Sequence, residues 1–212
     1  MYFHLQYLHM DTKKIPISRD ERFAKGIAAL RKKNYDYAIE LFQQTLTDNP
    51  DSAECRHHLW AAAREKLRAQ PVSGLNRLLR TLQLSALEAQ SIIHDLTRHP
   101  TAAIVSQERA ILLSPASIPA LLRLANLFLR HNLPCQQRAT LEEILLVDQD
   151  NYPALRQLSR IYYNAKEYRN SKTAASRALK INPGDLEAEN ILRDIAVLGV
   201  IEEGFDNIKP AT

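Results

Sequence analysis

The sequence predicts an all-α protein built from a repeated helical unit. Two observations carry this prediction: an unusual composition and a regular period along the chain. The 212 residues include only five glycines, so tight turns and glycine-rich phosphate loops are scarce. Apolar residues make up 45% and charged residues 25%, as in globular proteins, with Ala, Leu and Arg prominent among them. These three residue types favour helices.

The period is clearest where an offset of 34 aligns Ile118–Phe128 with Tyr152–Tyr162. Four positions coincide at this offset, namely Pro119/Pro153, Ala120/Ala154, Leu121/Leu155 and Leu124/Leu158. A further step of the same size toward the N-terminus places Ala86 in the same register. Such self-similarity is typical of arrays in which each unit packs only against its neighbours.

Five units follow in order along the chain. Their expected bounds are Arg19–Ser52, Ala53–Gln83, Leu84–Ser117, Ile118–Asn151 and Tyr152–Asp185. Tyr35 precedes Pro50 by the same fifteen residues that separate Tyr168 from Pro183. A proline there ends one helix and begins the turn into the next unit, because it lacks an N–H and restricts the preceding residue. The second unit is three residues short.

The spaced residues resemble the pattern of the tetratricopeptide repeat (TPR) family. The first unit supplies Gly26, Ala38, Phe42 and Pro50, and the last supplies Leu155, Leu158, Tyr162, Ala178 and Pro183. The second unit departs most, with Pro71 and Gly74 near its middle turn. The third has Gln90 and His94 where the family has Leu and Tyr. The resemblance implies a right-handed α-solenoid of antiparallel helix pairs over residues 19–185.

Segments outside the repeats are expected to form a capping helix and two ends. Residues 1–18 are expected to be an N-terminal arm and residues 205–212 a tail. The capping helix is predicted over 186–204, with Gly204 ending it. Its apolar stripe consists of Leu186, Ile191, Leu192, Ile195 and Leu198.

Charge is unevenly distributed, although the net charge is only +4. Residues 53–140 carry eleven Arg or Lys against five acids, whereas residues 185–206 carry seven acids and one arginine. This asymmetry can steer partners or pair subunits head to tail. The sequence contains no run of about 18 apolar residues, so no membrane-spanning helix is predicted. Without a recognisable signal peptide, the cytoplasm is the default localisation.

No catalytic, cofactor-binding or metal-binding site is predicted, and the chain is not expected to be an enzyme. His57 and His58 are adjacent, so on a helix their side chains point about 100° apart and cannot chelate one ion from one face. Cys55 and Cys135 lie far apart and form no metal-type spacing. The sequence also lacks a nucleophile elbow, a Walker loop and a dinucleotide fingerprint.

The TPR resemblance implies that the first helix of each pair lines a concave groove. In the fourth and fifth units this face presents Arg123, Asn126, Arg130, Arg156, Gln157, Arg160, Tyr163 and Asn164. Arginine forks suit carboxylates, and Asn amides suit a peptide backbone. The set loosely resembles the carboxylate clamp of co-chaperone TPR domains. It departs from that clamp at Leu122 and Gln157, where the clamp has lysine and asparagine.

These features favour a non-enzymatic protein-interaction scaffold whose groove binds a peptide or helix of a partner, with acidic segments favoured by the arginines. Two alternatives stay open. One is nucleic-acid binding through the basic middle repeats, which is disfavoured because the arginines are not interleaved with stacking aromatics. The other is an assembly module, in which the chain associates with another protein or with itself.

Overall fold

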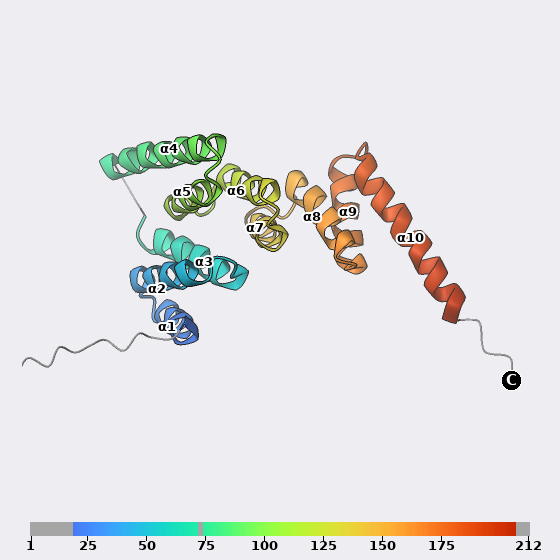
Figure 1. Ribbon diagram of the computed structural model, residues 1–212, viewed down its shortest axis with the longest axis horizontal. Helices are drawn as coiled ribbons and strands as arrows, with labels where there is room; N and C mark the ends of the chain where they lie inside the picture. Colours follow the sequence, from blue (N-terminus) through green and yellow to red (C-terminus); the bar gives the residue numbers. More distant parts are fainter. Residues whose placement is uncertain (1–18, 72–73, 207–212) are drawn as a thin grey trace, which may run out of the picture.

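The computed structural model describes residues 19–71 and 74–206, which form ten helices and no strand (Figure 1). The all-α prediction is therefore confirmed. The helices are α1 (Arg19–Arg31), α2 (Tyr35–Asp48), α3 (Ala53–Ala69), α4 (Gly74–Leu96), α5 (Pro100–Leu113), α6 (Ile118–Arg130), α7 (Pro134–Val147), α8 (Tyr152–Asn164), α9 (Tyr168–Ile181) and α10 (Leu186–Asp206). The expected arm, 1–18, lies outside the described residues.

The helices α6 and α8 begin at equivalent positions of the repeat, so residues that are one repeat apart lie on the same helical face. Ser117 accepts a hydrogen bond from the Ala120 N–H at the start of α6, and Asn151 accepts one from the Ala154 N–H at the start of α8. A proline also lies in the first turn of each helix, where it is favoured because an N–H at that position would have no partner within the helix.

The turns inside the helix pairs also repeat. Arg98, Asn132 and Lys166, which recur at the repeat offset, have φ near +60°, and Lys33 does the same in the first pair. The next N–H then reaches back five residues, as from Leu133 to the Phe128 carbonyl at 2.8 Å. This is the left-handed helix ending that satisfies orphan carbonyls and reverses the chain.

Antiparallel pairs form between α1 and α2, α4 and α5, α6 and α7, and α8 and α9, and each pair stacks on further helices. Small residues lie where two helices approach each other closely. A Cβ at Gly26 would lie 2.6 Å from Phe42 Cε1, which explains glycine in the first unit. Ala120, Ala154 and Ala188, again one repeat apart, are fully buried where each unit meets the one before it.

The second unit differs from its prediction, because it has no second helix. Its first helix, α3, runs for 17 residues and ends at Ala69, just before the turn that was expected near Pro71 and Gly74. Residues 74–83 then join the following helix instead of packing back on α3, so α4 is 23 residues long. The expected boundary between Gln83 and Leu84 therefore lies within a continuous helix. Leu67, the equivalent of Lys33 one repeat later, lies inside α3, and the positive φ of this stretch occurs instead at Gly74, at +57°.

As a result, the α1–α3 block packs against α5 and α7, the second helices of two later pairs (Figure 1). Polar contacts hold this junction. Arg56 Nε donates to Glu108 Oε1 at 2.5 Å, and its guanidinium carbon lies 5.3 Å from the centre of the Phe128 ring. Glu143 of α7, whose side chain is 1% exposed, pairs with Arg64 and His57 of α3.

The last helix caps the array. Ala188 and Ile191 of α10 are buried against the preceding pair. The helix continues to Asp206, two residues past the glycine that was expected to end it, and residues 207–212 lie outside the described part. None of the described helices is both long and apolar enough to cross a membrane.

Candidate functional site

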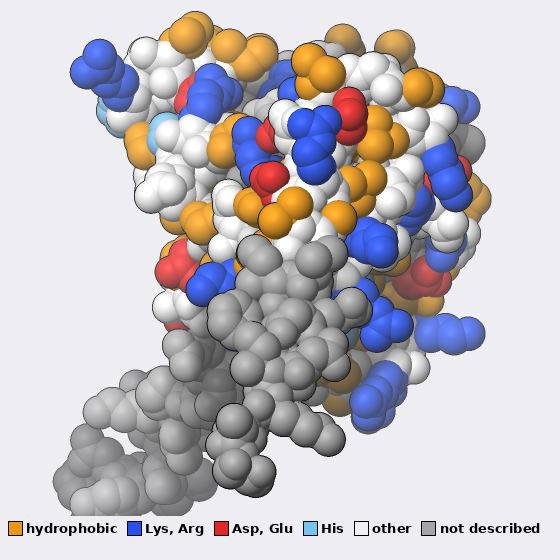
Figure 2. Space-filling model, turned by 90° about the vertical axis from the view of Figure 1, so that its right-hand side faces the viewer, with side chains coloured by type: hydrophobic (Ala, Val, Ile, Leu, Met, Phe, Trp, Pro, Cys, Tyr) orange, Lys and Arg blue, Asp and Glu red, His pale blue; other side chains and the backbone are white. Residues whose placement is uncertain are grey.

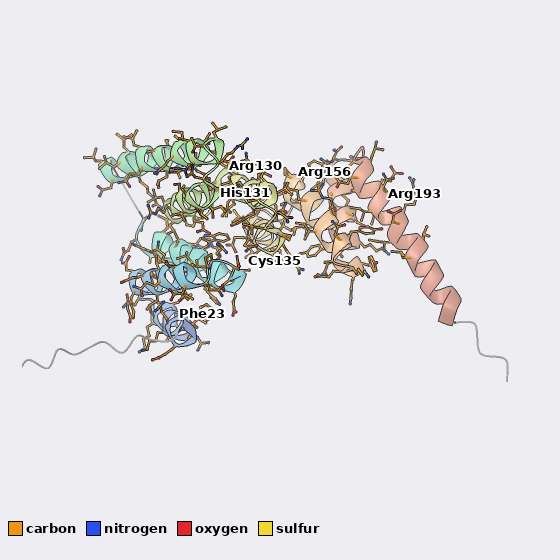
Figure 3. All side chains as sticks on the ribbon, viewed as in Figure 1. Phe23, Arg130, His131, Cys135, Arg156 and Arg193 are labelled. Atoms are coloured by element: carbon orange, nitrogen blue, oxygen red, sulfur yellow. The ribbon has the colours of Figure 1, made fainter. Side chains whose placement is uncertain are left out.

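The eight predicted groove residues come from two helices in the same register. Arg123, Asn126 and Arg130 lie on α6, and the other five lie on α8. They form matched pairs on one face of the array, because each of three α6 residues has an α8 counterpart one repeat later. The pairs are Arg123 with Gln157, Asn126 with Arg160, and Arg130 with Asn164. Figure 3 labels Arg130 and Arg156 in the upper half of the view, on the neighbouring helices α6 and α8.

The arginines of α6 pair with acids of the preceding first helix, α4. Arg123 Nη1 lies 3.7 Å from Glu88 Oε2. Arg130 forms an ion pair with Asp95, whose carboxylate also lies 3.1 Å from His131 Nε2. Asp95 is nearly buried, whereas about half of the Arg130 side chain is exposed. The guanidinium of Arg130 is thus held at one end and open to solvent at the other.

The arginines of α8 converge on one acid of α10. Arg156 Nη2 lies 2.9 Å from Glu187 Oε2, and Arg160 Nη1 donates to Glu187 Oε1 at 3.4 Å. Arg156 Nε is also 3.6 Å from Asp185, which is buried. Both arginines remain nearly half exposed. A carboxylate bridging the two guanidinium groups is therefore already present within the chain.

Gln157 and Tyr163 are tied to neighbouring helices. The side-chain oxygen of Gln157, Oε1, accepts a hydrogen bond from Gln137 Nε2 at 2.9 Å, which links α8 to α7. The Tyr163 hydroxyl donates to Asp194 Oδ2 at 3.4 Å. Desolvation, followed by the negative charge of Asp194, raises the pKa of Tyr163. Asn126 and Asn164 are exposed.

A hollow of about 420 Å³ adjoins this face between α8 and the turn from α6 to α7. It is lined by two of the predicted residues, Arg160 and Asn164, together with Leu129, Asn132, Leu133, Pro134, Cys135, Gln137, Arg138, Ile161 and Ala165. Arg138 sits between Glu142 and Glu167 and lies 4.8 Å from the centre of the Tyr162 ring. The apolar walls of this hollow were not predicted from the sequence.

A second hollow, of about 760 Å³, opens where the α1–α3 block meets α5 and α7. Leu46, Leu59, Ile104 and Phe128 contribute apolar walls, and Arg56 and Glu108 contribute charge. Sequence reasoning missed it because it depends on the fold-back of the first block. The only signal available was the short second unit.

The described residues offer no cluster of metal-ligand side chains beside these two hollows. Among residues 19–71 and 74–206, no group of three or more His, Cys, Asp and Glu is placed to hold a metal ion. Figure 2, which views the array from its α10 end, shows more Lys and Arg than Asp and Glu side chains, with hydrophobic side chains among them. At the predicted site, the ion pairs of the four arginines give a polar and locally balanced surface, suited to binding through several hydrogen bonds and ion pairs.

Neither a protein-family profile nor a curated protein matches the sequence. Solved structures do match the fold. The TPR domain of P58(IPK) is 13% identical, with a TM-score of 0.55 over 90% of this chain and 67% of that one. The chain folds as a tetratricopeptide repeat array. The resemblance noted in the sequence is thus confirmed at the level of fold.

Two other TPR domains match over shorter stretches of the array. The first TPR domain of Spaghetti (RPAP3), solved with the HSP90 peptide SRMEEVD, is 14% identical over 56% of this chain and 94% of that one, with a TM-score of 0.49. The Sgt2 TPR domain from Aspergillus fumigatus is 18% identical over 61% of this chain and 85% of that one, with a TM-score of 0.46.

Proposed function

We propose that this TPR array is a non-enzymatic scaffold that binds an extended or helical segment of a partner protein across α6 and α8. The observation that carries the proposal is the matched row of half-exposed arginines and exposed asparagines on these two helices. Guanidinium groups and amides together recognise carboxylates and backbone amides of a peptide. The stacked helices form this surface before a partner arrives, which reduces the entropy cost of binding.

Acidic segments are the favoured ligands, although the face is not simply basic. Each of its four arginines already has an acid of a neighbouring helix within ion-pair distance. A partner carboxylate would therefore share the remaining N–H donors of Arg156 and Arg160 with Glu187. This favours a ligand that also contacts Asn126, Asn164 and the adjoining hollow over one recognised by charge alone. It also weakens the case for phosphate-driven nucleic-acid binding.

Changing Arg156 and Arg160 together to alanine is expected to reduce binding by at least about tenfold, because two charge-assisted hydrogen bonds are lost. The measurement is titration against a peptide array containing acidic, neutral and basic segments. The decrease should be confined to the acidic peptides, and their affinity should become less dependent on salt.

Lys172→Ala with Arg177→Ala provides a control that removes the same charge from α9. This control should bind as the wild type does. Equal losses in both variants would show a non-specific charge effect, and an unchanged affinity in the groove variant would rule out the proposed face. Circular dichroism should show the same helicity in all three proteins.

A further inference from the structure

The outer face of α4 carries a long apolar stripe that no described helix covers. Its large members are exposed to between 47% and 77%, and they are Leu75, Leu78, Leu79, Leu82, Ile92, Ile93 and Leu96. At about 100° per residue these positions fall on one side of the helix, with Ala86 and Ala89 between them. The opposite side, around the buried Ser91, packs on α5.

The repeat register explains why this face is open. Ala86 is equivalent to Ala120, Ala154 and Ala188, which are fully buried against the preceding unit, yet Ala86 is exposed. Ile93 is equivalent to Leu127, which is 1% exposed. Before α6, α8 and α10, the second helix of the preceding pair covers these positions. Before α4 that helix is missing, because residues 74–83 extend α4 instead.

The stripe is complementary to itself when it is reversed. In an antiparallel pair centred between Ser85 and Ala86, Leu75 would lie opposite Leu96 and Leu78 opposite Ile93. Leu79 would then face Ile92, and Leu82 would face Ala89. Large residues would meet at both ends and small ones at the centre, where the helices approach most closely. The stripe is thus self-complementary, as a two-fold interface requires.

Charge does not oppose such a pair. Glu88 and Asp95 point toward α6, where they meet Arg123 and Arg130. Arg77 and Arg80 lie on the side of the helix away from Leu75 and Leu82. Apart from Glu88, which pairs with Arg123, the positions beside the stripe are uncharged, so two copies would not place like charges in opposition. An interfacial membrane helix would instead carry its cations beside the apolar face.

We propose that α4 is a self-association surface through which a second copy of this chain packs antiparallel, supplying the helix that the second unit lacks. A 23-residue helix is about 34 Å long. One helix face of this length is smaller than the roughly 800 Å² per partner that specific stable interfaces bury, so the dimer is reversible and its population depends on concentration.

The test is analytical ultracentrifugation of the full chain between about 1 and 500 µM. The wild type is expected to pass from monomer to dimer, and Leu78→Glu with Leu82→Glu is expected to remain monomeric with unchanged helicity. Leu146→Glu, at an exposed leucine of α7, is the matched control and should dimerise normally. A monomeric wild type throughout, or a charge variant that still dimerises, would overturn the proposal.

Cross-linking checks the geometry. In a Cys135→Ser background, which removes the exposed native thiol, Ala86→Cys treated with a short bismaleimide should give a covalent dimer. Open-ended oligomers without this cross-link would assign the contact to head-to-tail packing and overturn the two-fold pair. If the protein stays monomeric and instead sediments with vesicles containing anionic lipid, the stripe is a membrane-binding surface and the proposed two-fold pair is overturned.

Discussion

Replacing Glu143 by alanine is expected to lower the free energy of unfolding by about 3–5 kcal/mol, since one member of a buried ion pair is removed. Its side chain is 1% exposed and lies between Arg64 and His57. Without it, Arg64 is left at a helix–helix junction without its ion-pair partner. Because these contacts join α3 to α7, the loss should fall on the α1–α3 block.

Urea unfolding and hydrogen exchange together measure this effect. Amides of α1–α3 should exchange faster in Glu143→Ala, whereas those of α8 and α9 should be unchanged. Glu189→Ala is the control, because Glu189 forms an exposed pair with Arg193 on α10 and should cost less than about 0.5 kcal/mol. Equal stability of Glu143→Ala and the wild type would contradict the described junction.

Phe128→Ala is the second change with a large expected effect, a loss of about 3–5 kcal/mol in the free energy of unfolding. Phe128 is 1% exposed on α6, and its ring faces the Arg56 guanidinium. The change would remove buried apolar area, leave a cavity, and abolish a cation–π contact that contributes about 0.5–2 kcal/mol. Phe128→Leu should recover much of the packing but not the ring contact.

The neighbouring Leu129, which is 44% exposed, gives the matched control. Leu129→Ala lies on the same helix and should cost less than about 1 kcal/mol, because much of the side chain is already in water. Chemical denaturation of the three variants provides the comparison. Similar losses for Phe128→Ala and Leu129→Ala would show that α6 is not packed as described.

The regular units could be predicted because their signals are local and recur. Proline and an N-cap residue begin both α6 and α8, and the alanines one repeat apart identify the buried face. The eight predicted groove residues lie on α6 and α8, and their role in binding stays a prediction. In the second unit Ser52 also caps the first helix, but no proline follows it in the first turn, and residues 74–83 suit one long helix as well as a separate one.

The ion pairs and the fold-back could not be predicted, because they join residues that are distant in the sequence. Arg156 and Glu187 meet only when α10 stacks beside α8. Glu143 is buried only because α3 lies over α7, whereas its equivalent Arg177 on α9 is partly exposed. The arginine-lined groove predicted from the sequence is therefore partly neutralised by acids from neighbouring helices.

The central claim is that α6 and α8 form the binding face. Site-specific photo-cross-linking tests it most directly, with a photoreactive amino acid placed at the exposed Asn126, Asn164 or, as a control on α9, Lys172. In native lysate, we expect one discrete cross-linked product from both asparagine positions and none from Lys172. Cross-linking from Lys172 alone, or equally from all three positions, would contradict the account.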